Sequence, residues 1–330
     1  MVKLLKFFII FMVGIYQVPA YAESIHSFKT YPVRDNGQLK VDGNNLINQY
    51  GKQVQLRGIS SFWLNWIGEF SNPSSIKTLK EEWGINIFRA AMGVEVEFGY
   101  LKEPVSMVTK VESLIQTCIK QDLYIIVDYH AHEANKDLQA AQKFFAYIAK
   151  KYGKYPNIIY EIWNEPLKVS WDEEIRPYMV EVIKTIRRYD PDNIILVGSP
   201  YWCQKVSEAY DNPVKDKNVM YTTHFYTGSA GEERRQEIER LWQAGCPIFV
   251  SEFGVSIYDG GTLDRNVYLD EADRWIDWMN DRKISWLAWS LCDKNEASAL
   301  LLPGASKNGS WNDNELSKAG HYIKKRLQSK

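Results

Sequence analysis

The chain has almost no excess of charge of either sign, with 40 basic against 41 acidic residues among 330. Such an even balance gives no electrostatic reason to expect binding to nucleic acid or to an anionic membrane. The sequence also lacks low-complexity tracts, internal repeats, linker-like segments and apolar runs long enough to span a bilayer. We therefore expect one globular domain without a separate binding module.

Cysteine is scarce, with four residues at Cys118, Cys203, Cys246 and Cys292. Their spacings match no zinc or redox motif. Cys118 falls within a helical pattern and is expected to be a buried thiol. In an exported chain the four admit up to two disulfides, in three possible full pairings, and the sequence does not choose among them. No cofactor is implied.

The first 22 residues have the pattern of a secretory signal peptide. Lys3 and Lys6 supply a positive start, a short apolar stretch around Phe7 to Val13 follows, and Ala20-Tyr21-Ala22 is a small-x-small cleavage site. We expect a mature domain of residues 23–330 that is secreted to the extracellular space or the periplasm and is not attached to a membrane. An uncleaved anchor is the alternative.

Strand patterns and helix patterns alternate along the rest of the chain. The predicted strands are Val54–Ile59, Ile85–Ala90, Tyr124–Tyr129, Ile158–Trp163, Ile194–Gly198, Val219–Phe225, Ile248–Ser251 and Ser285–Ser290. The predicted helices are Ile76–Trp83, Val105–Gln121, Leu138–Tyr152, Glu173–Tyr189, Cys203–Tyr210, Glu233–Ala244, Leu269–Arg282 and Glu315–Leu327. This alternation predicts an α/β fold, the (β/α)8 barrel, with a hairpin in residues 36–52 closing its N-terminal end. An open doubly wound sheet is disfavoured, because no Gly-rich phosphate turn follows the first strand.

Two of the predicted strands deliver a carboxylate at their C-terminal ends. The stretch Asn157-Ile-Ile-Tyr-Glu-Ile-Trp-Asn-Glu-Pro-Leu167 must leave the sheet at Pro166, which has no N–H to donate, so Asn164 and Glu165 lie at the rim. The stretch Pro247-Ile-Phe-Val-Ser-Glu-Phe-Gly254 presents Glu252 in the same way. Strand C-termini converge on one face of a barrel, and two acids meeting there are what glycoside hydrolysis requires.

The other strand ends carry polar or aromatic side chains, namely Arg89, His130, His132, His224, Tyr226 and Trp289. Each has an ordinary structural reading alone, and their joint position at one face favours a site. His130 and His224 are expected to bind sugar hydroxyls or to orient the acids. His130 and His132 lack a third ligand at suitable spacing, so no metal site is predicted. Glu161 lies deeper than Glu165 and is expected to satisfy buried hydrogen bonds.

The expected mechanism assigns different protonation states to the two acids. Glu165 must keep a proton for the glycosidic oxygen, through burial or a neighbouring acid, while Glu252 stays ionised as the nucleophile. We expect Arg89 to keep Glu252 charged and Tyr226 to donate a hydrogen bond to it. Asn164 would bind the sugar 2-hydroxyl. A separation of about 5–5.5 Å between the carboxyl groups would give retention at the anomeric carbon.

These segments together resemble the glycoside hydrolase family 5 endoglucanases of bacterial type, which are retaining β-1,4-glucanases. The resemblance covers nearly the whole chain after the first 55 residues. It rests on Leu56-Arg-Gly-Ile-Ser-Ser61, Ile87-Phe-Arg-Ala-Ala-Met92, Ile126-Val-Asp-Tyr-His130, Tyr160-Glu-Ile-Trp-Asn-Glu-Pro166, His224-Phe-Tyr226, Val250-Ser-Glu-Phe-Gly254, Tyr268-Leu-Asp-Glu-Ala272 and Ala288-Trp-Ser-Leu-Cys-Asp-Lys-Asn-Glu296. It implies Glu165 as acid/base and Glu252 as nucleophile.

The resemblance also implies binding residues that the strand pattern did not single out. Trp66 and Trp202 are implied as platforms on which sugar rings stack. Lys294 and Glu296 are implied as hydrogen-bonding residues on the non-reducing side of the cut. The same reading places Trp289 beside the scissile bond.

The chain departs from the family pattern in two places. Phe62-Trp63 stands where many relatives have His-Gly, and Gly93 stands where many have an aromatic residue. These changes bear on sugars further from the cut rather than on the chemistry. We expect a monomeric endo-β-1,4-glucanase that binds a β-glucan polysaccharide or oligosaccharide. The alternatives are a mannanase, a mixed-linkage glucanase or a xyloglucanase on the same scaffold, or a non-catalytic carbohydrate-binding protein.

Overall fold

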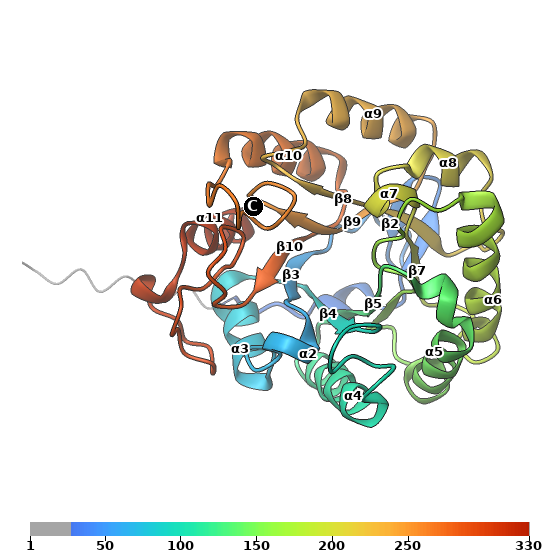
Figure 1. The fold of residues 1–330 in the computed structure, drawn as a ribbon, viewed down its shortest axis with the longest axis horizontal. Coiled ribbons are helices and arrows are strands. Elements are labelled where there is room, and N and C mark those ends of the chain that lie inside the picture. Colours follow the sequence, from blue (N-terminus) through green and yellow to red (C-terminus); the bar gives the residue numbers. More distant parts are fainter. Residues whose placement is uncertain (1–27, 330) are drawn as a thin grey trace, which may run out of the picture.

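The computed structural model describes residues 28–329, which form a closed barrel of strands surrounded by helices (Figure 1). The predicted signal peptide lies outside these residues. The barrel strands are β3 (Arg57–Ser61), β4 (Ile87–Gly93), β5 (Tyr124–His130), β6 (Ile158–Glu161), β7 (Ile195–Val197), β8 (Val219–Tyr226), β9 (Ile248–Gly254) and β10 (Trp286–Leu291). Within the described residues these eight strands are all parallel, and β10 pairs with both β9 and β3 to close the barrel. The predicted fold class is confirmed.

Helices follow the strands and cover the outside of the barrel. The long ones are α4 (Pro104–Lys120), α5 (Leu138–Tyr152), α6 (Arg176–Arg187), α9 (Glu232–Gln243), α10 (Leu269–Arg282) and α11 (Lys318–Gln328). Shorter ones are α1 (Pro32–Asn36), α2 (Leu64–Ile67), α3 (Pro73–Thr78), α7 (Pro200–Cys203) and α8 (Val206–Asp211), with single turns at η1 (Leu79–Trp83), η2 (Ala134–Asp137), η3 (Trp171–Ile175) and η4 (Asp313–Glu315). The predicted strands and helices are present, with bounds that differ by a few residues, except that the predicted helix Cys203–Tyr210 is divided between α7 and α8 because Cys203 has a left-handed backbone. No helix in residues 28–329 has both the length and the apolar character that crossing a membrane would take.

The predicted hairpin is formed by β1 (Lys40–Asp42) and β2 (Asn45–Ile47), which pair antiparallel. Its turn contains Gly43 in the left-handed region, at φ +59°, where glycine carries no steric penalty. Leu39 and Leu46 pack into an apolar cluster with residues from the N-terminal halves of the barrel strands, so the hairpin closes that end as predicted. Val54 donates its N–H to the carbonyl of Leu46, so the start of the first predicted strand joins the hairpin instead of the barrel.

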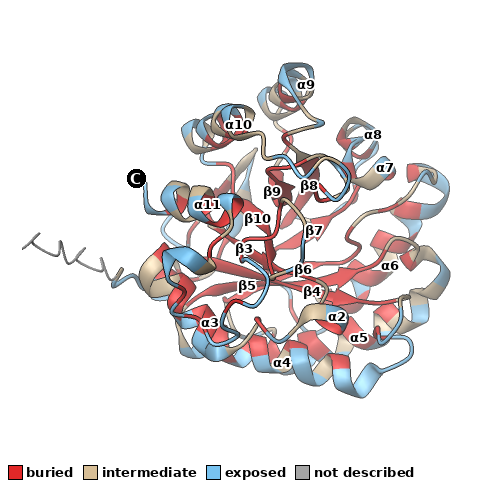
Figure 2. Ribbon diagram, turned by 60° about the vertical axis from the view of Figure 1, so that its left-hand side comes forward, coloured by how far each residue is buried: buried red, intermediate tan, exposed pale blue. Residues whose placement is uncertain are grey.

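Alternate residues of each strand point to opposite sides of the barrel wall, as strand geometry requires. On β5, Ile125 and Val127 belong to the large core between wall and helices, whereas Tyr124 and Ile126 belong to the interior cluster. Figure 2 shows the strands as buried and the helices as buried on the inner side and exposed on the outer side. The wall therefore has a core on each face, and polar residues inside it must be held by partners.

The four cysteines are free thiols buried in this core. Cys118 on α4 is buried, as its helical pattern predicted. Burial raises the pKa of Cys246 to about 12 and, as the largest cause, that of Cys292 to about 12 as well. At neutral pH these groups are therefore thiols rather than reactive thiolates.

Candidate active site

The C-terminal ends of the strands bring the predicted polar residues together in one cleft. A carboxylate oxygen of Glu165 lies within 4.8 Å of one of Glu252, although the two residues come from strands on different sides of the barrel. Strand β6 ends at Glu161, earlier than predicted, but the chain beyond it stays beside β5, because Asn164 N and Glu165 N bond to the carbonyls of Tyr129 and Ala131. Both residues therefore lie at the rim.

Arg89 on β4 is the centre of the charged network. Its side chain is completely buried, and its Nε lies 2.6 Å from Glu161 Oε2 while its Nη1 lies 2.9 Å from Glu252 Oε2. Its Nη2 donates to Asn164 Oδ1 at 2.6 Å and lies 3.0 Å from Asp128 Oδ2. Burial lowers the pKa of Arg89, but the three carboxylates outweigh it and hold that pKa well above its ordinary value. The guanidinium therefore stays charged, and its predicted contact with Glu252 is present together with ion pairs inside the barrel.

Glu252 on β9 has a hydrogen-bond partner on each oxygen. Arg89 contacts Oε2, and the Tyr226 hydroxyl donates to Oε1 at 2.8 Å. Burial, together with the charge of Glu252, holds the pKa of Tyr226 well above its ordinary value, so this hydroxyl remains a donor. Both predicted contacts to Glu252 are confirmed. Each partner donates to the carboxylate, and together they fix its position.

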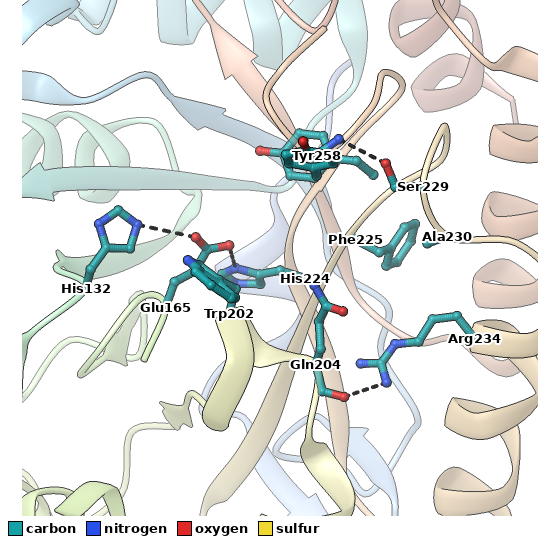
Figure 3. A pocket seen from close by; sticks show the side chains of 11 residues that line it. His132, Glu165, Trp202, Gln204, His224, Phe225, Ser229, Ala230, Arg234 and Tyr258 are labelled. Atoms are coloured by element: carbon teal, nitrogen blue, oxygen red, sulfur yellow. Dashed lines mark hydrogen bonds and ion pairs between the residues drawn. The ribbon is translucent and has the colours of Figure 1, made fainter. Parts of the chain in front are cut away.

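Glu165 is surrounded differently, by two histidines (Figure 3). His224 Nδ1 lies 2.9 Å from its Oε1, and His132 Nε2 lies 3.5 Å from its Oε2. Burial raises the pKa of Glu165, but the contacts with His132 and His224 outweigh it and leave that pKa below its ordinary value. The expectation that burial or a neighbouring acid keeps the proton on Glu165 is therefore wrong for the unliganded site.

The proton that Glu165 lacks is held by its neighbour. Burial opposes a charge on His224, yet hydrogen bonds with Glu161 and Glu165 raise the pKa of His224 to about 10. Its Nε2 lies 2.9 Å from Ser251 Oγ, and Ser251 in turn donates to Glu161 Oε1 at 2.6 Å. This chain fixes the ring, so Nδ1 faces Glu165. The contacts of Glu161 with Arg89 and Ser251 confirm that it satisfies buried hydrogen bonds.

His130 on β5 is held between aromatic rings. It stacks on Trp289 with ring centroids 5.3 Å apart and planes 4° apart, and the ring of Trp63 meets it edge to face at 4.1 Å. Its Nδ1 lies 2.6 Å from Asp128 Oδ2, which leaves Nε2 as the nitrogen able to contact a ligand. Burial and the charge of Arg89 lower the pKa of His130 to about 3, so the ring is neutral.

His130 and His132 face different partners and do not point toward a common ligand position. His130 contacts Asp128, whereas His132 faces Glu95 and Glu165. Ligand atoms of Glu165, His224 and Glu252 do lie within 4.8 Å of one another. Both ring nitrogens of His224 are engaged by protein oxygens, so the arrangement fits a hydrogen-bonded acid pair better than a cation site.

Trp202 lies beside Glu165 (Figure 3). It lines a cleft of about 570 Å³ together with His132, Glu165, His224, Tyr226, Gln204, Arg234 and Tyr258 (Figure 3). Tyr201, Trp202 and Cys203 all have left-handed backbone angles, with φ of 57°, 55° and 60°. Such angles cost roughly 1–2 kcal/mol per residue, and here Trp202 N bonds to Pro166 O at 2.8 Å, which ties the loop to the turn carrying Glu165.

The remaining predicted binding residues lie away from this cleft. Lys294 Nζ and Glu296 Oε2 form an ion pair at 2.7 Å, and Lys294 Nζ lies 5.0 Å from the centre of the Phe62 ring. Burial raises the pKa of Glu296 in spite of that pair. Trp66 is 46% exposed and lines a separate hollow of about 410 Å³. Their sugar-binding roles stay predictions.

The sequence reasoning missed several residues of the network. Asp128 lies two positions before His130 and so on the same face of β5, a signal that the strand period offered. Ser251 directly precedes Glu252 and by regular alternation would point away. A register shift between β8 and β9 lets both face the interior, and such an irregularity has no clear sequence signal.

Comparison with known proteins agrees with this geometry. A sequence model of the family described as "Cellulase (glycosyl hydrolase family 5)" matches residues 47–295. Endoglucanase 5 of Pectobacterium carotovorum subsp. carotovorum is 43% identical over 93% of this chain and 60% of its own length. Endoglucanase N of Pectobacterium atrosepticum is 42% identical over 93% of this chain and 69% of its own. The chain thus spans about two thirds of the length of these curated relatives.

Solved structures show the same barrel. A structure from Cytophaga hutchinsonii has a TM-score of 0.88 at 42% identity, over 91% of this chain and 97% of that one. The catalytic domain of an endoglucanase of Thermobifida fusca has a TM-score of 0.86 at 34% identity, over 91% of this chain and 100% of that one. A variant of that domain was solved in complex with cellotetraose. The chain therefore belongs to the cellulase family, glycosyl hydrolase family 5.

Proposed function

We propose that the chain is a retaining endo-β-1,4-glucanase that cuts cellulose-like glucans internally. The observation that carries the proposal is the pair of carboxylates within 4.8 Å of each other, one held by Arg89 and Tyr226 and the other by histidines. Retaining enzymes hold their two carboxyl groups about 5–5.5 Å apart, whereas inverting enzymes need about 6.5–9.5 Å to admit a water. The close approach and the unlike surroundings support double displacement.

In the first step, an oxygen of Glu252 attacks the anomeric carbon while the bond from that carbon to the glycosidic oxygen breaks. Glu165 gives its proton to the departing oxygen, and the sugar becomes an ester of Glu252. Tyr226 and Arg89 hold the attacking carboxylate in place. Asn164 presents its amide NH₂ to the 2-hydroxyl, because its oxygen is already taken by Arg89.

The proton for this step comes from the pair formed by Glu165 and His224. In the unliganded site the shared proton resides on His224, 2.9 Å from the carboxylate. A sugar chain in the cleft excludes water from the pair, and exclusion of water disfavours an ion pair relative to a neutral imidazole and a neutral carboxyl. Substrate binding therefore moves the proton toward Glu165, where the leaving oxygen needs it.

In the second step Glu165, now ionised, takes a proton from a water molecule. That water attacks the anomeric carbon on the face that the leaving group vacated, and the ester bond to Glu252 breaks. His132 and His224 stay within contact of Glu165 and orient it for this reversal of role. Two displacements return the anomeric centre to its original configuration.

The sugar-binding residues divide into those near the leaving-group sugar, on the side of Glu165, and those near the sugar that is attacked. Trp202 lies beside Glu165 and is positioned to stack on the leaving-group sugar. Trp289 and the Nε2 of His130 face the sugar that is attacked, since His130 stacks on Trp289 next to the Arg89 network. Lys294 and Glu296 would bind beyond it, toward the non-reducing end.

A comparison of substrates tests this proposal. Initial rates are measured on carboxymethyl cellulose, mannan, barley mixed-linkage glucan and xyloglucan, and the glucans with β-1,4 linkages should be preferred. A clear preference for mannan would overturn the choice of substrate, and binding of glucan without any hydrolysis would indicate a non-catalytic carbohydrate-binding protein. Proton NMR of the first product should show the β-anomer, whereas an α-anomer would contradict retention.

We also propose that residues 1–22 direct export and that the mature chain acts outside the cytoplasm as a monomer. The positive start, apolar stretch and Ala20-Tyr21-Ala22 site support export. Mass spectrometry of the exported protein should find an N-terminus at residue 23, and an intact first residue would contradict cleavage. Sedimentation of that product should give a particle of one chain.

A further inference from the structure

Trp63 and Trp66 are brought together by the short helix α2, which begins directly after the end of β3. Trp66 N donates to the carbonyl of Trp63 at 3.0 Å, and the two positions are one turn apart, so their side chains share a face. Their ring centroids lie 4.9 Å apart with 30° between the planes. The 46% exposed ring of Trp66 therefore rests on that of Trp63, which is half-buried.

Trp63 in turn rests on the catalytic cleft. Its ring meets that of His130 edge to face at 4.1 Å and lies 5.8 Å from that of His132. The aromatic surface is thus continuous from Trp289 through His130 and Trp63 to Trp66. Beyond Trp66 it opens into the hollow of about 410 Å³, whose lining includes the polar side chains of Glu69, Ser71, Thr109, Lys110 and Ser113.

Gly93, at the end of β4, makes this arrangement possible. A Cβ at this position would lie 3.0 Å from Cε3 of Trp63 and 2.0 Å from Oδ1 of Asn65. A larger side chain would first displace Asn65 on α2, the helix that carries Trp66, and would also press on the Trp63 ring. The two departures of this chain from the family pattern, at Trp63 and at Gly93, are therefore neighbours in the structure.

The Trp63 and Trp66 pair lies across the barrel from Trp202. In the order of the closed barrel, β3 and β7 are four strands apart, which is the greatest possible separation (Figure 1). Trp66 follows β3, whereas Trp202 follows β7 and lines the cleft on the side of the acid Glu165. Because the acid protonates the leaving group, the surface of Trp63 and Trp66 belongs to the side that keeps the anomeric carbon.

We propose that Trp63, for which Gly93 leaves room, supports the Trp66 ring and extends the sugar platform implied for that residue, so that the two rings select glucans with several units on the non-leaving side. The inference rests on the proposed function. Stacked rings present two apolar faces in series, and each ring fixes the other, so loss of either should remove the benefit of both.

Aryl β-glycosides of cellobiose, cellotriose and cellotetraose test the platform, because their leaving group is the same and they differ on the non-leaving side alone. For the wild type, kcat/KM should rise with the number of glucose units. Trp63→Ala and Trp66→Ala should each reduce that rise in kcat/KM by about 2- to 12-fold, as expected for aromatic stacking of roughly 0.5–1.5 kcal/mol. The double variant should lose no more than either single one.

Control variants distinguish a loss of the platform from a general loss of structure or activity. Tyr189→Ala removes an aromatic ring of similar exposure, 45%, at the end of α6 and should leave the rise intact. Trp202→Ala should lower kcat/KM without changing its dependence on length. Gly93→Ala should reduce the rise in the wild type and should not reduce it further in Trp63→Ala. Equal losses at every length, or additive losses of Trp63 and Trp66, would overturn the proposal.

A binding measurement keeps the two proposals distinguishable. Cellotriose to cellohexaose are titrated calorimetrically into Glu252→Gln, with and without Trp63→Ala. If the wild type hydrolyses no β-glucan, the proposed function fails, while a gain of affinity with length that requires Trp63 still supports the platform. If the wild type hydrolyses glucan and neither kinetics nor affinity on longer chains depends on Trp63, the platform alone is wrong.

Discussion

The two ends of the barrel interior differ in chemistry although both are buried. On β4 the interior residue Ile87 is followed two positions later by Arg89, and on β5 Ile126 is followed in the same way by Asp128. On β6 Ile159 precedes Glu161. On each of these strands, two successive residues that face the interior therefore belong to different layers, the first apolar and the second charged. The lesson is that burial alone does not tell which part of a core stabilises the fold and which part holds the site.

The two layers contribute to the free energy of unfolding in different ways. The N-terminal layer, which includes Leu46 and Leu196, gains roughly 25 cal/mol per Å² of apolar surface removed from water. The C-terminal layer buries Arg89 with three carboxylates, and the cost of removing such charges from water can exceed their mutual attraction. We infer that the apolar end supplies most of the stability and that the charged layer serves the proposed reaction.

The largest expected effect is a loss of activity on removing a carboxylate of the charged layer. Glu252→Gln removes the nucleophile and should lower kcat on a β-1,4-glucan on the order of 10⁴-fold or more, as loss of a covalent catalyst does. Its melting temperature should stay equal or rise, because Arg89 keeps Glu161 and Asp128 as partners. Activity assays and thermal unfolding check both outcomes. A variant with wild-type turnover would rule out Glu252 as nucleophile.

The second prediction concerns the cation that holds the charged layer together. Arg89→Met leaves three buried carboxylates without their shared partner and should lower the free energy of unfolding by roughly 3–5 kcal/mol. Lys184→Met is the control, because Lys184 pairs with Glu181 on the exposed face of α6 and such pairs contribute about 0–1 kcal/mol. Urea unfolding measures both. Equal effects of the two variants would contradict the account of the network.

The third prediction probes the apolar layer. Leu46→Ala, on β2 of the hairpin that closes the N-terminal end of the barrel, should lower the free energy of unfolding by about 2–5 kcal/mol through lost burial and the cavity left behind. The kcat of the folded fraction should not change, because the hairpin lies at the end of the barrel opposite the cleft. Paired unfolding and kinetic measurements test this. A selective loss of kcat with full stability would show that the two layers are not separable.

The smallest expected effect concerns pH. In the wild type the proton shared by His224 and Glu165 is lost as pH rises through about 10, the pKa of His224, and the alkaline limb of kcat/KM should lie there. In His224→Asn the proton must be held by Glu165 alone, so the limb should move to lower pH by at least about one unit, equal to about 1.4 kcal/mol. An unchanged limb would show that His224 does not hold the catalytic proton.

Most of the fold and the pair of acids were predictable because they depend on local patterns. Apolar runs that stop at Pro166 or before Gly254 mark strand ends, and barrel geometry places strand ends together. The protonation state of Glu165 was not predictable, since it depends on His132 and His224, which come from other strands. Ser251 was missed because a register shift turns it inward.

Local sequence was sufficient to specify which residues carry charge, which strands are buried and where each strand ends, because these follow from the period of the side chains and from backbone chemistry within a few residues. The local sequence did not specify the distances between side chains on different strands. The approach of two carboxylate oxygens to within 4.8 Å, the raised pKa of His224 beside Glu165 and the close approach of Trp63 to Gly93 arise when the barrel closes. Closure sets them because it juxtaposes groups far apart along the chain in a space from which water is largely excluded.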